Sequence, residues 1–213
     1  MSTIPTKEEM YKAFEERHGK ELQNKLLHTT VAICGLGGLG SNISVALTRL
    51  GVGKLIIIDF DKVDISNLHR QQYKASQVGM EKAVALKENL KEISPYIDVE
   101  PIVAKIDATN MDDLLSKADI VCEAFDNPQN KAMLVNYVLE NMPDKYLVAA
   151  SGMAGMDSVN MIKTRKIGKR FYLCGDGVNE VGKADGLFST RVMACAAHEA
   201  HMVLRIISEN FDV

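Results

Sequence analysis

The chain contains 213 residues, of which 46% are apolar and 25% are charged, and its formal net charge is -3. This length suits one α/β domain with a short appendage, and the charge gives no broad attraction to nucleic acid or anionic membrane. No apolar run reaches the ~18 residues that a spanning helix needs, and the mixed-charge N-terminus lacks the apolar centre of a signal peptide. We therefore expect a cytoplasmic protein with no nucleic-acid or membrane partner.

Predicted helices and strands alternate along the first 150 residues. The N-terminal segment has the apolar spacing of an amphipathic helix over residues 6–27. Continuous apolar runs typical of buried strands lie within residues 29–38, 54–61, 99–106, 119–126 and 145–153. Helical patterns separate these runs, over residues 41–51, 76–94, 109–118 and 127–142. Such an alternation predicts an α/β fold with a doubly wound, Rossmann-like, mostly parallel sheet that is covered on both faces.

The last third of the chain has a different pattern. Residues 159–166 and 169–174 are predicted to form antiparallel strands, followed by a loop and an apolar helix from about 190 to 207. We expect a single domain over residues 1–213, in three parts. They are an N-terminal helical segment (1–28), a Rossmann-like core (29–150) and a mixed antiparallel C-terminal extension (151–213).

A glycine loop joins the first predicted strand to the helix that follows. Gly35, Gly37, Gly38 and Gly40 form a GxGxxG pattern, which lets a phosphate or ribose approach the helix N-terminus. Asp59 closes the next strand, where a carboxylate can accept hydrogen bonds from ribose hydroxyls. The pattern indicates a nucleotide, and taken alone it favours NAD because that is the commonest ligand of this loop.

The stretch DFDKVDISNLHRQQY, which follows the glycine loop, argues against NAD. Beyond Asp61 it carries Asn67, Arg70 and Gln71, and Lys82 begins the next predicted helix. A hydride-transfer enzyme needs no such cluster of cations and amides. A site for a triphosphate does, because charge builds on the α-phosphate and on departing pyrophosphate. Arg70 and Lys82, if taken singly, would be ordinary solvated charges.

Several spaced motifs together resemble one protein family. GLGGLGSN, DFDKVDISNLHRQ, GMEKA and AFDNPQNK are similar to the ThiF/MoeB/HesA family of ubiquitin-activating-like enzymes, over roughly residues 10–208. That family adenylates the C-terminal glycine of ubiquitin-fold carrier proteins for thiamine or molybdopterin synthesis. The resemblance therefore implies ATP and Mg²⁺ as cofactors, a small sulfur carrier protein as partner, and a homodimer.

The resemblance also implies roles for individual residues. Asp59 corresponds to the ribose ligand, and Asn67, Arg70 and Lys82 correspond to the phosphate ligands. Asp126 corresponds to the magnesium-associated carboxylate, with an N-cap of the next helix as the alternative or additional role.

An N-terminal arginine in relatives reaches the ATP of the partner protomer. Arg17 is the nearest candidate for that role, and an ordinary surface charge is an equal alternative.

The chain departs from the family pattern at its cysteines. Cys34 and Cys122 lie in predicted buried strands, and no two of the four cysteines form a CxxC pair, so we expect neither disulfides nor a structural zinc. Cys195, His198 and His201 lie on one predicted helix, where packing with one buried histidine is preferred over a metal site.

Relatives that bind their carrier covalently place a cysteine in the loop before the last helix. That loop, GVNEVGKADGLF, has none here. Cys174 is the only substitute, and the nearby acids Asp176 and Glu180 disfavour a reactive thiolate.

The sequence thus predicts an adenylyltransferase that stops at an acyl adenylate, most like the compact second type of ThiF, with a ThiS-like carrier as substrate. The alternatives are a MoaD-like carrier, a small-molecule or tRNA carboxylate, an NAD-dependent oxidoreductase and a non-catalytic nucleotide-binding module.

Overall fold

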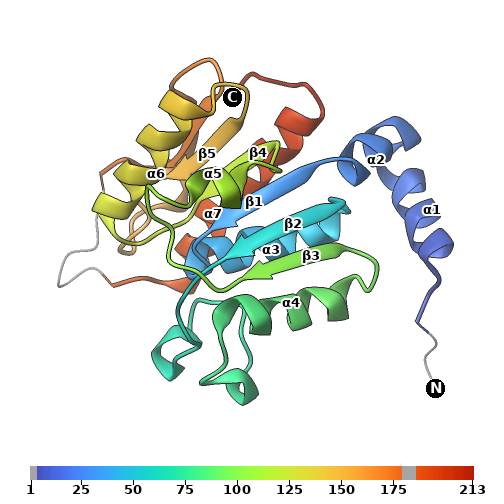
Figure 1. Cartoon of the computed structure of the whole chain (residues 1–213), viewed down its shortest axis with the longest axis horizontal. Coiled ribbons are helices and arrows are strands. Elements are labelled where there is room, and N and C mark those ends of the chain that lie inside the picture. The colour runs from blue at the N-terminus through green and yellow to red at the C-terminus, as the bar shows by residue number, and fades with distance from the viewer. Residues whose placement is uncertain (1–3, 179–185) are drawn as a thin grey trace.

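Seven strands form one sheet within residues 4–178 and 186–213, which the computed structural model describes (Figure 1). They are β1 (Thr30–Cys34), β2 (Lys54–Ile58), β3 (Asp98–Ile102), β4 (Ile120–Glu123), β5 (Tyr146–Ala150), β6 (Lys163–Lys166) and β7 (Phe171–Gly175). Their order across the sheet is β3-β2-β1-β4-β5-β7-β6. The pairs are parallel up to β7, and β6 runs antiparallel to β7. The predicted α/β fold, with its Rossmann-like sheet and C-terminal antiparallel pair, is confirmed.

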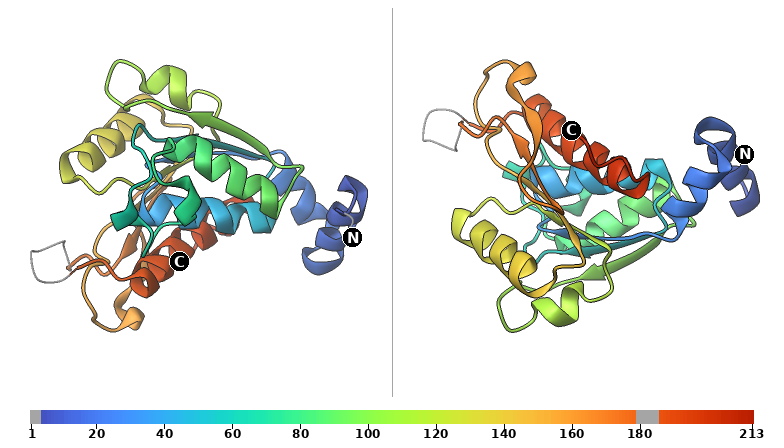
Figure 2. Two further views of the ribbon diagram at one scale, coloured as in Figure 1. Left: turned by 90° about the horizontal axis from the view of Figure 1, so that it is seen from below. Right: turned by 90° about the horizontal axis from the view of Figure 1, so that it is seen from above.

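Helices cover both faces of the sheet (Figure 2). The helices are α1 (Lys7–His18), α2 (Lys20–Leu27), α3 (Gly38–Leu50), α4 (Lys82–Ile93), α5 (Met111–Leu115), α6 (Pro128–Asn141) and α7 (Ser189–Ile207). One apolar cluster joins α3, α4 and α7 to one face of the sheet, and a second joins α5 and α6 to the other. None of the helices in the described ranges is long and apolar enough to cross a bilayer.

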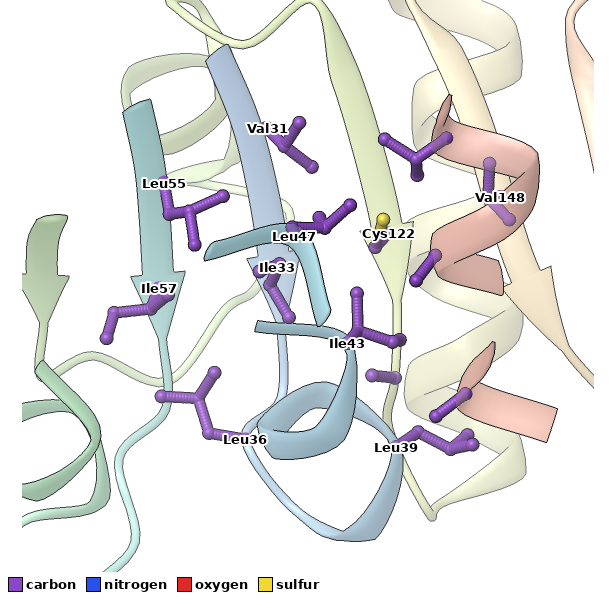
Figure 3. Close-up of a cluster of buried hydrophobic side chains, with 14 of the residues drawn as sticks. Val31, Ile33, Leu36, Leu39, Ile43, Leu47, Leu55, Ile57, Cys122 and Val148 are labelled. Carbon is purple, nitrogen blue, oxygen red and sulfur yellow. The ribbon is translucent and has the colours of Figure 1, made fainter. Parts of the chain in front are cut away.

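Alternate residues of the central strands supply the two clusters. Val31 and Ile33 of β1 point toward α3, where Ile43 and Leu47 meet them, as Figure 3 shows. Ala32 and Cys34 point to the opposite face. Because helices cover both faces of these central strands, their sequences show no alternation of apolar and polar residues.

The N-terminal helical pattern forms two helices, which corrects the single helix predicted over residues 6–27. Gly19 separates α1 from α2 with φ of 87°, a left-handed backbone value that favours glycine. A capping box between Thr6 and Glu9 begins α1. Both helices project from one end of the sheet (Figure 2).

The helix predicted to start at residue 76 begins six residues later, at Lys82. Residues Ala75–Gln77 form a 3₁₀ turn, and Gly79 then takes φ of 91°. A bridge between Lys62 and Glu81 fixes the chain just before α4. The apolar spacing typical of a helix thus continues through residues 76–81, although the chain there forms a turn that ends at Gly79.

The C-terminal strands continue the main sheet. β7 pairs in parallel with β5, so the antiparallel partner β6 forms the sheet edge. Lys163 and Lys166 are exposed on that edge, where lysines oppose strand pairing between molecules.

Candidate functional site

The glycine loop turns from β1 into α3 at the carboxyl end of the central strand. A Cβ on Gly40 would lie 1.8 Å from the carbonyl oxygen of Gly35, so only glycine fits there. Gly37 is the N-cap of α3, and within the described ranges no side chain caps that helix. The first N–H groups of a helix of 13 residues are therefore suited to bind an anion.

Two acids and a lysine lie beside this loop. Asp59 Oδ2 accepts the Leu36 N–H at 2.6 Å, and Asp59 Oδ1 accepts the Asp61 N–H at 2.8 Å. Burial raises the pKa of Asp59, and the charge of Lys82 opposes that rise. The Lys82 ammonium, on a residue only 6% exposed, lies 2.9 Å from Asp61 Oδ2. Lys82, the predicted phosphate ligand, thus lies close enough to Asp59, the predicted ribose ligand, for its charge to affect the pKa of that carboxyl.

The segment that carries Asn67, Arg70 and Gln71 folds back against the loop. Arg70 Cγ lies 3.6 Å from the position of a Cβ on Gly38, and Gln71 Nε2 lies 3.7 Å from that position on Gly37. The carbonyl oxygen of Asn67 accepts the N–H groups of Arg70 and Gln71 at 3.2 and 3.1 Å. The side chains of Arg70 and Gln71 therefore lie against the backbone at the start of α3, although more than 30 residues separate the two segments in sequence.

Asn42 and Tyr73, which no sequence pattern singled out as site residues, hold this segment in place. The Asn42 amide donates to the carbonyl oxygen of Arg70 at 3.2 Å and accepts from Gln72 Nε2 at 2.7 Å. The Tyr73 hydroxyl donates to the carbonyl oxygen of Leu36 at 2.8 Å. Both residues lie within the motifs quoted above, Asn42 in GLGGLGSN and Tyr73 in DFDKVDISNLHRQQY. Each is a polar residue that the fold buries, so its hydrogen-bonding groups need partners within the protein.

Asp126 lies beyond β4, the other neighbour of β1. Phe125 Cδ1 is 3.0 Å from the position of a Cβ on Gly35, so this turn touches the glycine loop. Asn127, not Asp126, caps α6 by accepting the Asn130 N–H at 3.0 Å, which corrects the N-cap alternative. The Asp126 carboxylate is exposed and makes no hydrogen bond to another described residue. It therefore stays accessible to a cation.

Arg17 lies far from the glycine loop of its own chain. It is exposed in the last turn of α1. Phe14 and Gln23 lie beside Gly51, which ends α3, whereas the glycine loop begins that helix. The 13 residues of α3 span about 20 Å. Within one chain, the structure does not bring Arg17 to the other candidates.

The residues gathered here fit a nucleotide phosphate and a metal ion. Gln71 is 7% exposed, and its Oε1 has no hydrogen-bond partner among the described residues. This buried acceptor suits a ligand that brings a donor, such as a ribose hydroxyl, while the uncapped N–H groups of α3 suit its phosphate oxygens. One accessible carboxylate, Asp126, suits a hard cation such as Mg²⁺ that shares the phosphates.

The four cysteines are free and buried. Within the described residues, no three His, Cys, Asp or Glu side chains group as metal ligands. On α7, Cys195 is buried, but His198 is half-buried and His201 is exposed, so the expected buried histidine is wrong. Of the two acids expected beside Cys174, Asp176 pairs with buried Arg191, and Glu180 lies outside the described residues.

Cys174→Ala should retain ATP–pyrophosphate exchange. Burial, reinforced by the Glu199 carboxyl, raises the pKa of the Cys174 thiol to about 12. At pH 7 about one molecule in 10⁵ then carries the thiolate nucleophile. Intact-mass spectrometry under non-reducing conditions, with the equally buried Cys195→Ala as control, would measure any adduct with the carrier. An enzyme–carrier species that disappears only in Cys174→Ala would contradict this expectation.

Comparison with known proteins identifies the family. A model described as the ThiF family matches residues 11–211. The adenylyltransferase and sulfurtransferase UBA4 of Lodderomyces elongisporus is 32% identical over 179 residues, which cover 78% of this chain and 39% of that protein. The molybdopterin-synthase adenylyltransferase of Haemophilus influenzae is 38% identical over 113 residues, 53% of this chain and 46% of that protein. The chain thus spans less than half the length of these curated relatives.

A solved structure shares the fold. E. coli tRNA N6-threonylcarbamoyladenosine dehydratase, TcdA, in complex with ATP has a TM-score of 0.86 and 19% identity. The match covers 97% of this chain and 98% of that one. From the family match over nearly its whole length, the chain belongs to the ThiF family.

Proposed function

We propose that the chain is an ATP-dependent adenylyltransferase that activates the C-terminal glycine carboxylate of a ubiquitin-fold sulfur carrier protein. The observation that carries the proposal is the position of Arg70 and Gln71 against the uncapped N-terminus of α3, with the Lys82 ammonium beside Asp59 and Asp61 next to the same loop. Such donors suit the charge that builds on a triphosphate during nucleotidyl transfer. Membership of the ThiF family, whose curated relatives include named adenylyltransferases, supports the same reaction.

In the proposed reaction, a carboxylate oxygen of the carrier attacks the α-phosphorus of ATP. The bond from that phosphorus to the oxygen bridging to the β-phosphate breaks, which gives an acyl adenylate and pyrophosphate. No general base is required, because a carboxylate is already ionised at neutral pH. Arg70 binds phosphate oxygens as a two-pronged donor, Lys82 supplies a point charge, and Asp59 accepts hydrogen bonds from the ribose. Mg²⁺ held by Asp126 would supply further positive charge to the phosphates.

The proposed carrier is ThiS-like, and the proposed chemistry stops at the adenylate. The absence of cysteine from the loop GVNEVGKADGLF and the burial of Cys174 both support this. We also propose a homodimer with Arg17 acting on the partner's nucleotide. The exposed apolar side chains Met156, Phe188 and Met193 offer surface for such an interface.

One alternative substrate is a MoaD-like carrier, and another is a small-molecule or tRNA carboxylate. Arg70 and Lys82 count against an NAD-dependent oxidoreductase, and the intact set of candidate phosphate ligands counts against a non-catalytic binding module. Exchange of radiolabelled pyrophosphate into ATP, measured with a panel of carriers, separates these possibilities. Exchange that depends on one carrier supports the proposal, whereas NAD reduction without exchange would overturn it.

Asp126→Asn should raise the Mg²⁺ concentration that gives half-maximal exchange by more than about tenfold, because an amide is a weaker ligand for a hard cation. The thermal unfolding temperature should stay near that of the wild type, since the carboxylate is exposed. Asp144→Asn, an exposed acid at the opposite end of the strands, is the control. An unchanged Mg²⁺ requirement in Asp126→Asn would remove that residue from the site.

A further inference from the structure

An ion pair whose carboxylate is buried joins the residues on either side of Asp126 in the chain. Glu123, the last residue of β4, is 1% exposed, and the Lys131 ammonium donates to its two carboxylate oxygens at 3.0 and 2.8 Å. Lys131 stands in the first turn of α6, and its side chain is 21% exposed. The pair thus joins the end of the strand to the start of the next helix, with Asp126 on the connection between them.

The same carboxylate also holds the backbone of that connection. Glu123 Oε1 accepts the Phe125 N–H at 2.7 Å. On the other side, the Ala124 N–H donates to the carbonyl oxygen of Cys34 at 2.9 Å, next to the glycine loop. The N–H of Lys131 donates to the carbonyl oxygen of Asn127 at 3.0 Å. The residues on both sides of Asp126 are therefore fixed, while its own side chain is left exposed.

Stability alone does not account for this arrangement. Burial raises the pKa of Glu123, and Lys131 opposes that rise. Desolvation of a buried ion pair typically costs about as much as its attraction returns, so apolar residues of similar size are often equally stable. Glu199, fully buried on α7, adds a second carboxyl whose oxygens have no hydrogen-bond partner in the described ranges. Because this ion pair adds little to stability in a poorly solvated site, we look for its role in the position that it gives the backbone around Asp126.

We propose that Glu123 and Lys131 are positioning residues that direct Asp126 toward the metal and phosphates at the glycine loop. This inference rests on the proposed function, because it assumes that Asp126 holds Mg²⁺. Residues that orient a metal ligand by direct hydrogen bonds change metal affinity about 10–100-fold when they are replaced. Glu123 and Lys131 act instead through the backbone at Phe125 and Asn127, so we expect an effect at the lower end of that range. Replacing either residue should therefore reduce the increase in nucleotide affinity that Mg²⁺ gives, and it should leave the affinity without Mg²⁺ unchanged.

The test compares Glu123→Gln, Lys131→Met and the double variant. Isothermal titration with α,β-methylene-ATP, which cannot transfer its adenylyl group because the bond to the bridging atom is not cleaved, measures affinity with and without Mg²⁺. We expect the gain in affinity on adding Mg²⁺ to fall about tenfold in each variant, with unchanged affinity without metal. Lys131→Arg should restore the gain, because its guanidinium can also pair with both carboxylate oxygens.

Two controls separate positioning from stability. Lys54 has a side chain of similar exposure, 28%, and its ammonium lies 2.6 Å from a Glu100 carboxylate oxygen at the opposite end of the strands. The Lys54→Met variant should therefore keep the full effect of Mg²⁺ on nucleotide affinity. The double variant buries no unpaired charge, so it should unfold near the wild-type temperature and still show the metal defect. A wild-type Mg²⁺ effect in the double variant would overturn the proposal, as would parallel losses with and without metal.

Asp126→Asn distinguishes failure of this inference from failure of the proposed function. If Asp126→Asn changes the Mg²⁺ effect and the double variant does not, only the positioning role is wrong. If Asp126→Asn leaves both Mg²⁺-dependent affinity and exchange unchanged, the metal role in the proposed function is wrong as well.

Discussion

Arg70→Ala should lower ATP–pyrophosphate exchange by at least about 10²-fold, the usual cost of removing one donor that stabilises charge formed during transfer. The guanidinium makes few contacts that the fold needs. Its Nη1 lies 3.2 Å from the carbonyl oxygen of Ser66 and 3.3 Å from the His69 ring. The backbone of Arg70 is held independently, by Asn42 and Asn67. We therefore expect a folded protein whose kcat falls more than its affinity for ATP.

Two further variants sharpen this expectation. Arg70→Lys should recover only part of the activity, because an ammonium cannot bind two phosphate oxygens as a guanidinium does. Arg49→Ala, which removes an exposed arginine near the far end of α3, should have no effect. Exchange within about tenfold of the wild type in Arg70→Ala, a loss of only ~1.4 kcal/mol, would show that Arg70 is not in the site.

The sheet could be predicted because its strands carry the signal themselves. Runs such as TVAIC and KLIII are apolar at every position or nearly so, and only a strand covered on both faces requires this. The glycine loop could be predicted for a similar reason, since its spacing reflects local backbone geometry at Gly35 and Gly40. In both cases the determinant lies within a few neighbouring residues.

The features that sequence reasoning missed depend on contacts between distant segments. Asn42 is bonded to Arg70 and Gln72, which lie about 30 residues away, and nothing near Asn42 in sequence identifies those partners. The break at Gly19 was missed because glycine lowers helix propensity by only about 1 kcal/mol, so apolar spacing continued through it. Glu123 ends a strand and Lys131 lies in the next helix, and neither local pattern indicates that their side chains pair.

Lys82→Met should lower kcat/KM for ATP by about 10²-fold and should also change the pH dependence of binding. In the wild type, burial raises the pKa of Asp59, and Lys82 limits that rise. Without the ammonium, the pKa of Asp59 rises further. Ribose binding uses the ionised carboxylate, so the loss of ATP binding on acidification should begin at a higher pH than in the wild type.

Stability should change in the opposite sense with pH. An acid whose pKa is higher in the folded state than in the unfolded state holds its proton more tightly when folded. Its contribution to the free energy of unfolding is therefore lost as pH rises from the unfolded value of about 4 through the folded pKa. Lys82→Met widens this interval, so its destabilisation relative to the wild type should be larger at pH 7 than at pH 4.

Thermal unfolding between pH 4 and 7, together with kcat/KM over the same range, measures both effects. Lys87→Met, on the same helix, is the control, because Lys87 forms no salt bridge with the described residues and should leave both profiles unchanged. If Lys82→Met and wild type gave parallel pH profiles, Lys82 would not be coupled to Asp59. Its ammonium, held 2.9 Å from Asp61, would then act on phosphate alone.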